Sequence, residues 1–288
     1  MEGQIKCYAR SKEILSLLSL YGPLSSRTLM NLMTPAIKER RLLDSLARLK
    51  RKEFIQSRFE KVFAGTGTFY QITQAEDARS MVSKILNCNA EYLKQPQFSY
   101  RELLHSQSCA VWCHYLKRVI PSVRIVRDYE FKNCEQSKAI LQWSDKQSDL
   151  SPDLLLLLPN TKTQESVTIA VEIEKSRKSD ERLLKKISKF ANSSLVDGVI
   201  YLCDTDYLAE VVRQIYKSRV LYSAHRIKQY ANNFFMFSNS LDEQKYDSLN
   251  LYNAALKNVS LLTWTSYLTK TYCNKRRDHE IETSAGGC

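Results

Sequence analysis

Glycine and proline are scarce in this chain, with 7 and 6 among 288 residues, so its composition is not that of a linker or a low-complexity protein. Long apolar stretches are missing too. The longest run, Leu154–Leu158, is far shorter than the ~20 residues that span a bilayer. The N-terminus, MEGQIKCYARSKEIL, has no apolar signal core. These absences predict a cytoplasmic protein without membrane insertion.

The sequence also lacks closely spaced cysteine pairs of the CxxC type. None of the eight cysteines forms a CxxC pair, and their scattered positions predict reduced thiols. One cluster, Cys109, Cys113 and His114, offers zinc ligands as an alternative. Cysteines at i and i+4 within the apolar stretch CAVWCHYL are more typical of buried helix packing.

Positive charge is what the chain has in excess. Its 43 lysines and arginines outnumber 31 aspartates and glutamates, which gives a formal net charge of +12. Such a balance favours a polyanionic partner through counterion release, with DNA, RNA and anionic membrane surfaces as alternatives. The 43% hydrophobic content and the length together predict about two folded domains.

The first 75 residues have the pattern of three helices and a hairpin. Residues 11–21 repeat apolar side chains at helical spacing and end at a Gly-Pro pair, and Ser25 is a suitable N-cap for a second helix. A Thr-Pro pair predicts the start of a third helix, over about residues 36–51. Two strands, 54–58 and 69–73, are expected around a turn at Ala64-Gly65-Thr66-Gly67.

The third predicted helix is apolar on one side and basic on the rest of its surface. The inward stripe is expected to consist of Ile37, Leu42, Leu43, Leu46 and Leu49. The candidate DNA-binding residues are Lys38, Arg40, Arg41, Arg48, Lys50 and Arg51.

This order of elements resembles winged-helix DNA-binding domains over residues 8–75. The resemblance implies double-stranded DNA as the partner, with the third helix in the major groove and the hairpin on the backbone. A dimerisation or protein-docking module with a solvated basic face is the alternative. Another helix is expected over about residues 75–89. Residues 76–99 are expected to form a helical connector, and the domain boundary is expected near residue 95.

Residues 100–270 have the pattern of an α/β domain (α+β mixed). The expected elements are a helix at 100–119, strands at 123–131, 153–158 and 167–174, a basic helix at 179–195 and a strand at 199–202. This order predicts a mixed sheet flanked by helices. Residues 205–270 are expected to add helices and a strand around 233–239, and residues 271–288 to form a polar tail in which Lys275, Arg276 and Arg277 contact phosphate.

Acidic residues lie within strands that are otherwise built of Val, Ile and Leu. Asp153 opens one strand, and Glu172 and Glu174 alternate with apolar residues in the next, so both glutamates point to one face. Mg²⁺ or Mn²⁺ would compensate this charge, lower the pKa of a bound water and stabilise the leaving 3′ oxygen in phosphodiester cleavage. In the alternative interpretation the glutamates face solvent and pair with Lys175 and Arg177.

The Pro-Asp pair at 152–153, followed by Glu-Ile-Glu at 172–174, resembles the PD-(D/E)xK nuclease superfamily, which has the restriction-endonuclease-like fold. That family's usual lysine, two residues after the first Glu, is here Glu174. Some members carry the lysine on the following helix, where Lys186, one turn before an aromatic residue, is the best candidate. Its neighbours on the predicted helix, Lys185 and Lys189, are additional candidates.

A winged helix joined to such a domain is similar to the replication-relaxation group, which includes MobC-type relaxases, over residues 8–205. The resemblance implies a metal-dependent endonuclease that nicks a specific DNA site, the transfer origin of a plasmid or mobile element, together with other transfer or transposition proteins. The implied catalytic residues are Asp153, Glu172, Glu174 and Lys186, of which the three acids bind metal, and His105 stands where the group often has a histidine. Two alternatives remain open: a catalytically inactive nuclease-like DNA-binding regulator or accessory protein of replication or transfer, and a transposon-end endonuclease that acts with a partner transposase.

Overall fold

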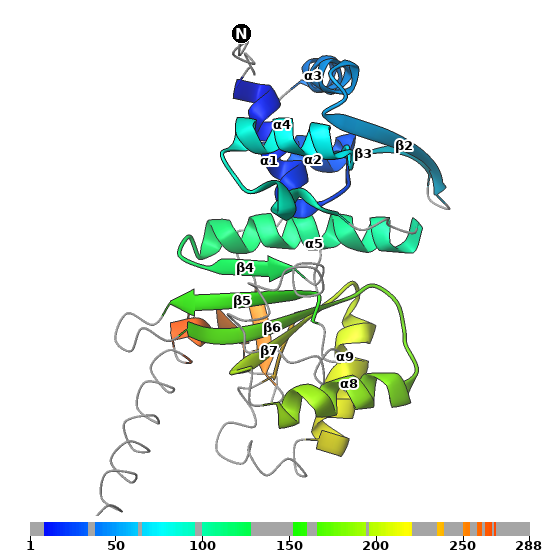
Figure 1. The fold of residues 1–288 in the computed structure, drawn as a ribbon. Helices are drawn as coiled ribbons and strands as arrows, with labels where there is room; N and C mark the ends of the chain where they lie inside the picture. Colours follow the sequence, from blue (N-terminus) through cyan, green and yellow to red (C-terminus); the bar gives the residue numbers. More distant parts are fainter. Residues whose placement is uncertain are drawn as a thin grey trace, which may run out of the picture. The chain divides into compact units, whose positions relative to one another are not determined.

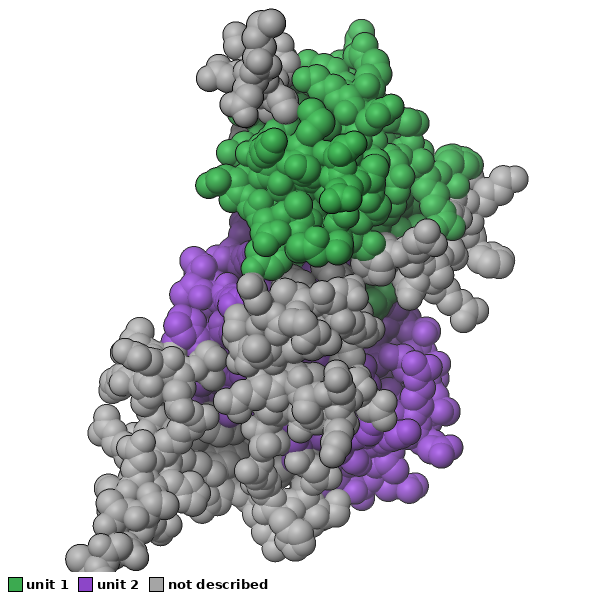
Figure 2. Space-filling view, viewed as in Figure 1, with its two compact units in different colours: residues 1–114 green, residues 115–288 purple. Residues whose placement is uncertain are grey.

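The protein has a mixed α/β fold with helices and two β-sheets in a computed structural model (Figure 1). The described residues are 9–33, 38–62, 65–95, 100–127, 152–159, 166–193, 196–220, 235–238, 250–253, 258–260, 263–266 and 268. They belong to two compact units, residues 1–114 and 115–288 (Figure 2). The predicted Thr-Pro helix start and the polar tail lie outside the described residues. None of the helices described is long and apolar enough to cross a membrane.

Helix α1 ends, and helix α2 begins, where the sequence predicts. Helix α1, Ala9–Tyr21, ends at Gly22, whose φ of 77° is the left-handed conformation that favours glycine, and the Gly22 N–H donates to Leu18 O at 3.1 Å. Helix α2, Ser26–Leu32, is capped by Ser25, whose Oγ accepts from Thr28 N at 3.1 Å.

Helix α3 spans Glu39–Arg51, with Lys38 as an N-cap that makes no side-chain capping bond. Its start is therefore three residues later than predicted. Leu42, Leu46 and Leu49 are buried as predicted, but the prediction for Leu43 was wrong, because its side chain is 42% exposed. Ser45 takes the inward position at 2% exposure, and its hydroxyl donates to Arg41 O at 2.9 Å, so burial costs it no hydrogen bond.

A three-stranded antiparallel sheet completes the hairpin region. Strands β2, Ile55–Val62, and β3, Gly65–Ile72, pair continuously from Ile55↔Ile72 to Val62↔Gly65, so the glycines expected in the turn lie within a strand. The prediction of a turn at Gly65, Thr66 and Gly67 was therefore wrong, and Ala64 lies outside the described residues. Strand β1, Leu24–Ser25, pairs with β3 and was not predicted, because two residues are too short to show periodicity.

Helix α4, Glu76–Leu86, ends at Asn87, which has a left-handed φ of 55°, earlier than the predicted residue 89. A 3₁₀ turn, η1 (Ala90–Leu93), follows it, and helix α5 then spans Tyr100–Val119 as predicted. The Gln107 side chain of α5 accepts from Ser25 N at 2.9 Å and donates to Pro23 O at 2.6 Å. These bonds fasten the first part of α5 to unit one, so the units divide after His114, within α5, rather than near residue 95.

Unit two contains a seven-stranded mixed sheet with the strand order β10-β9-β8-β7-β6-β5-β4. Its strands are β4 (Arg124–Arg127), β5 (Leu154–Pro159), β6 (Ser166–Glu174), β7 (Gly198–Cys203), β8 (Phe235–Ser238), β9 (Asn250–Asn253) and β10 (Asn258–Ser260). The central strands β6, β7 and β8 are parallel, and their outer neighbours pair antiparallel.

Parallel neighbours need long crossover connections, and helices supply them here. Helix α8, Asp180–Asn192, joins β6 to β7, and its N-cap Ser179 accepts from Arg182 N at 3.4 Å. Helix α9, Asp206–Ile215, follows β7 and continues into a π-helical turn, η3 (Tyr216–Val220). The predicted order of helix, three strands, helix and strand is confirmed, although β4 is described only over Arg124–Arg127.

The core of unit two lies between one sheet face and helices α8 and α9 (Figure 1). The sheet contributes buried side chains from alternate positions, and α8 contributes an apolar stripe. These residues include Leu155, Leu157, Ala170, Val199, Tyr201, Cys203, Leu183, Ile187 and Phe190. Strand alternation places the side chains at 172 and 174 on the same face as Ala170, beneath α8.

Candidate acidic site

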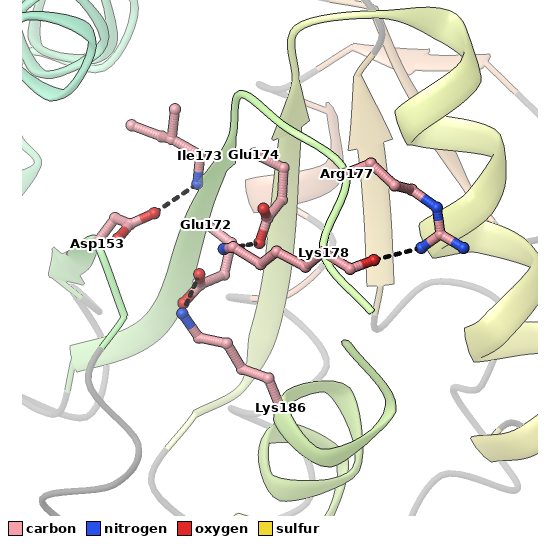
Figure 3. Close-up of polar contacts among 7 residues, drawn as sticks. All are labelled: Asp153, Glu172, Ile173, Glu174, Arg177, Lys178 and Lys186. Atoms are coloured by element: carbon pink, nitrogen blue, oxygen red, sulfur yellow. Dashed lines mark hydrogen bonds and ion pairs between the residues drawn. The ribbon is translucent and has the colours of Figure 1, made fainter. Parts of the chain in front are cut away.

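The register of β5 and β6 brings the predicted acids to adjacent positions. Leu154 pairs with Val171 in this antiparallel ladder, and one further step places Asp153 opposite Glu172, on the same face of the sheet. Asp153 is anchored there, because its Oδ2 accepts a hydrogen bond from Ile173 N at 2.7 Å (Figure 3). The position of Asp153 is thus fixed by the backbone of β6.

Glu172 is fully buried and contacts Lys186, the lysine chosen from the resemblance to nucleases. Lys186 Nζ, on α8, donates to Glu172 Oε2 (Figure 3). The other oxygen, Oε1, is buried and has no hydrogen-bond partner among the described residues. The Lys186 side chain is 26% exposed, so this ion pair lies at the edge of the core.

Glu174 has a different lysine partner. Its side chain is 2% exposed, and its Oε1 accepts from Lys178 Nζ at 2.6 Å (Figure 3). Lys178 was not among the site residues predicted from the sequence. The only signal in the sequence is its spacing of four residues from Glu174, and that spacing has no fixed meaning where a strand passes into a loop.

The alternative in which both glutamates face solvent was wrong. Both are buried on the helix-bearing face, and their lysine partners are Lys186 and Lys178. Arg177 pairs with Asp180 instead, and Lys175 is exposed.

Burial and like charge govern the electrostatics of the site. Burial raises the pKa of Glu172 to about 8, Asp153 and Glu174 add to the increase, and Lys186 opposes it. Burial acts to lower the pKa of Lys186, but the negative charges of Glu172 and Asp153 outweigh it and hold the pKa above its ordinary value. Lys186 therefore remains a cation, whereas Glu172 in the metal-free protein is mostly protonated at pH 7.

The neighbouring strand adds two buried groups to this environment. Tyr201 and Cys203 of β7 pair in register with Glu172 and Glu174. Burial raises the pKa of Tyr201 well above its ordinary value and that of Cys203 to about 12, and the nearby acids contribute to both shifts. Both groups are neutral at physiological pH, so neither supplies positive charge to the acids.

A divalent cation fits the chemistry of these donors. Glu172 Oε1 is buried and has no hydrogen-bond partner among the described residues, and Asp153 offers a second carboxylate from the adjacent strand. Across the described residues no group of three or more His, Cys, Asp and Glu side chains is already arranged around a metal position. The three-acid ligand set stays a prediction.

The remaining predicted residues differ in burial and in the unit to which they belong. On α8, Lys185 is exposed and Lys189 is half-buried. His105 is half-buried in α5 and belongs to unit one, whereas the acids belong to unit two. Cys109 and Cys113 are buried in α5.

All six candidate DNA-binding residues of the α3 region are exposed: Lys38, Arg40, Arg41, Arg48, Lys50 and Arg51. Lys50 Nζ donates to Ser57 Oγ at 2.7 Å, which links α3 to β2.

Comparison with known proteins gave no matching family model, curated protein or solved structure.

Proposed function

We propose that this protein is a divalent-metal-dependent DNA endonuclease that binds and nicks a specific site, as the resemblance to MobC-type relaxases implies. The N-terminal unit would be a winged-helix DNA-binding domain, which the order α1-β1-α2-α3-β2-β3 supports. The C-terminal unit would have a restriction-endonuclease-like fold, which the order β4-β5-β6-α8-β7, after the last residues of α5, supports.

One observation carries the proposal. A lysine from α8 contacts a fully buried glutamate whose second oxygen has no hydrogen-bond partner in the described part of the chain, beside an aspartate from the adjacent strand. Asp153 and Glu172 would hold Mg²⁺ or Mn²⁺, which supplies Lewis acidity and a water of lowered pKa. Lys186 would keep the Glu172 carboxylate oriented and place positive charge near the phosphate.

The exposed basic side chains of α3 would bind double-stranded DNA. Six lysines and arginines lie in or next to a single helix, and each phosphate that they neutralise releases condensed counterions. Binding by unit one would then supply the affinity for the DNA site, and the acids of unit two the chemistry.

The test is a nicking assay on supercoiled plasmid that carries the DNA flanking the gene, with Mn²⁺ or with EDTA. We expect Asp153→Ala and Glu172→Ala to abolish nicking and to retain DNA binding, while the matched variant Glu181→Ala, which removes an exposed acid of α8, nicks like the wild type. Undiminished nicking by the two acid variants would rule out this site.

A second candidate is a nuclease-like protein without catalytic activity that regulates or assists replication or transfer by binding DNA. Glu174, in place of the family's lysine, favours it, as does the pairing of both glutamates with lysines. Metal dependence separates the two: the regulator would bind its DNA equally well in EDTA and would nick under neither condition.

A further inference from the structure

The two glutamates of β6 differ in what their carboxylates contact, and this difference separates their roles. We infer that Glu174 is a positioning residue for Lys178, that Lys178 binds the phosphodiester next to the cleavage position, and that the metal is held by Asp153 and Glu172 without Glu174. The inference rests on the proposed function and assigns the roles within the same site.

Lys178 is held at both ends. Its ammonium lies 2.6 Å from Glu174 Oε1, and its carbonyl oxygen accepts from Arg177 Nη1, also at 2.6 Å (Figure 3). The guanidinium of Arg177 pairs in turn with Asp180 in the first turn of α8. The loop between β6 and α8 therefore holds Lys178 at two points, its backbone carbonyl and its ammonium.

The contacts of each carboxylate favour different ligands. Each glutamate has a lysine ammonium on one carboxylate oxygen. Of the two, only Glu172 has a second oxygen that is buried and lacks a hydrogen-bond partner among the described residues, which suits a cation. The Lys178 side chain is 26% exposed, so an anion can approach it from solvent. A lysine ammonium is a compact positive charge that binds phosphate oxygens.

Titration of Mn²⁺ into the full-length protein by calorimetry, with plasmid nicking as the second readout, tests this assignment. Glu172→Gln should weaken Mn²⁺ binding at least about tenfold, whereas Glu174→Gln should leave it within about threefold of the wild type. Nicking by Glu174→Gln should fall about tenfold or more, mainly through a higher KM for plasmid. Lys178→Met should reproduce that loss, and Lys178→Arg should restore part of it.

The double variant Glu174→Gln/Lys178→Met removes both charges together, so it leaves no buried charge unpaired. It should nick no more slowly than either single variant, because the two residues act as one unit. Lys175→Met, which changes an exposed lysine in the same loop, is the matched control and should behave as the wild type.

Loss of Mn²⁺ binding in Glu174→Gln would make Glu174 a metal ligand and overturn the inference while leaving the endonuclease intact. Wild-type nicking by Lys178→Met would overturn it as well. A wild-type protein that neither binds Mn²⁺ nor nicks would instead remove the proposed function, and this inference with it.

Discussion

Lys186 on α8 donates a hydrogen bond to Oε2 of Glu172 on β6, fourteen residues earlier in the chain. The contact joins a helix that otherwise packs through Leu183, Ile187 and Phe190 to the acidic part of the sheet face beneath it. A fully buried carboxylate is costly unless it is paired, so this lysine serves the fold as well as the proposed chemistry.

Replacement of Lys186 by Met should destabilise the metal-free protein. Above about pH 8, where Glu172 is ionised in the wild type, the change leaves this carboxylate buried without its cation, which costs about 2–3 kcal/mol after allowance for the partial exposure of the lysine. Lys185→Met, one residue earlier and exposed, should change the free energy of unfolding by less than about 0.5 kcal/mol. Urea unfolding monitored by circular dichroism measures both values, and equal stabilities would contradict the importance of the buried pair.

Stability should depend on pH through Glu172. Its pKa is raised from 4.5 to about 8, so at pH 7 the folded metal-free protein holds a proton that the unfolded chain has released. The free energy of unfolding should therefore fall as pH rises from about 4.5 to about 8 and then level off. Thermal melts across this range measure the effect, and Glu172→Gln should show a flatter profile.

The same shift predicts proton release on metal binding. A cation binds the ionised carboxylate, so Mn²⁺ affinity should rise with pH up to about 8, and binding at pH 7 should release nearly one proton. Calorimetry in two buffers of different ionisation enthalpy gives the number of protons. Binding with no proton release would place the ion away from Glu172.

Gly198, at the start of β7, should not tolerate a side chain. A Cβ at this position would lie 2.9 Å from Cζ2 of Trp264, a buried ring that cannot move easily. We expect Gly198→Ala to destabilise the protein by about 1–3 kcal/mol. Gly67→Ala is the comparison, because its Cβ would make an ordinary contact of 3.6 Å with Phe69. Similar losses in both variants would refute the close approach of Trp264.

The basic helix α3 should determine affinity for DNA. Arg40→Ala combined with Arg41→Ala should weaken binding and reduce the slope of log affinity against log salt by about 0.9 for each lost phosphate contact. Lys94→Ala, which removes an exposed lysine paired with Glu91, should leave the slope unchanged. Fluorescence anisotropy at several salt concentrations measures it, and an unaltered slope in the double variant would place DNA elsewhere.

Much of the fold could be predicted from the sequence, because long amphipathic helices and strongly apolar strands repeat over many residues. Helix α5 and the order from β4 to β7 followed from such periodicity. The two-residue strand β1 and the inward position of Ser45 did not, because both depend on tertiary packing.

The candidate site was predictable only in part. Asp153 and Glu172 could be grouped because strand alternation fixes which way each side chain points, whereas Lys186 was chosen through the resemblance to nucleases that carry the lysine on the following helix. Lys178 was missed because it reaches Glu174 through a loop conformation that Arg177 fixes, and loop conformations have no periodic pattern in sequence. The orphaned oxygen of Glu172 likewise depends on which side chains surround it in three dimensions.

Anomalous diffraction at the manganese edge, from crystals grown with Mn²⁺, tests the central claim most directly. We expect a peak within about 2.0–2.6 Å of Glu172 Oε1 and of an Asp153 carboxylate oxygen, the usual range for oxygen ligands of hard cations. A fully occupied manganese elsewhere on the protein, with Glu172 still bound only by Lys186, would contradict it.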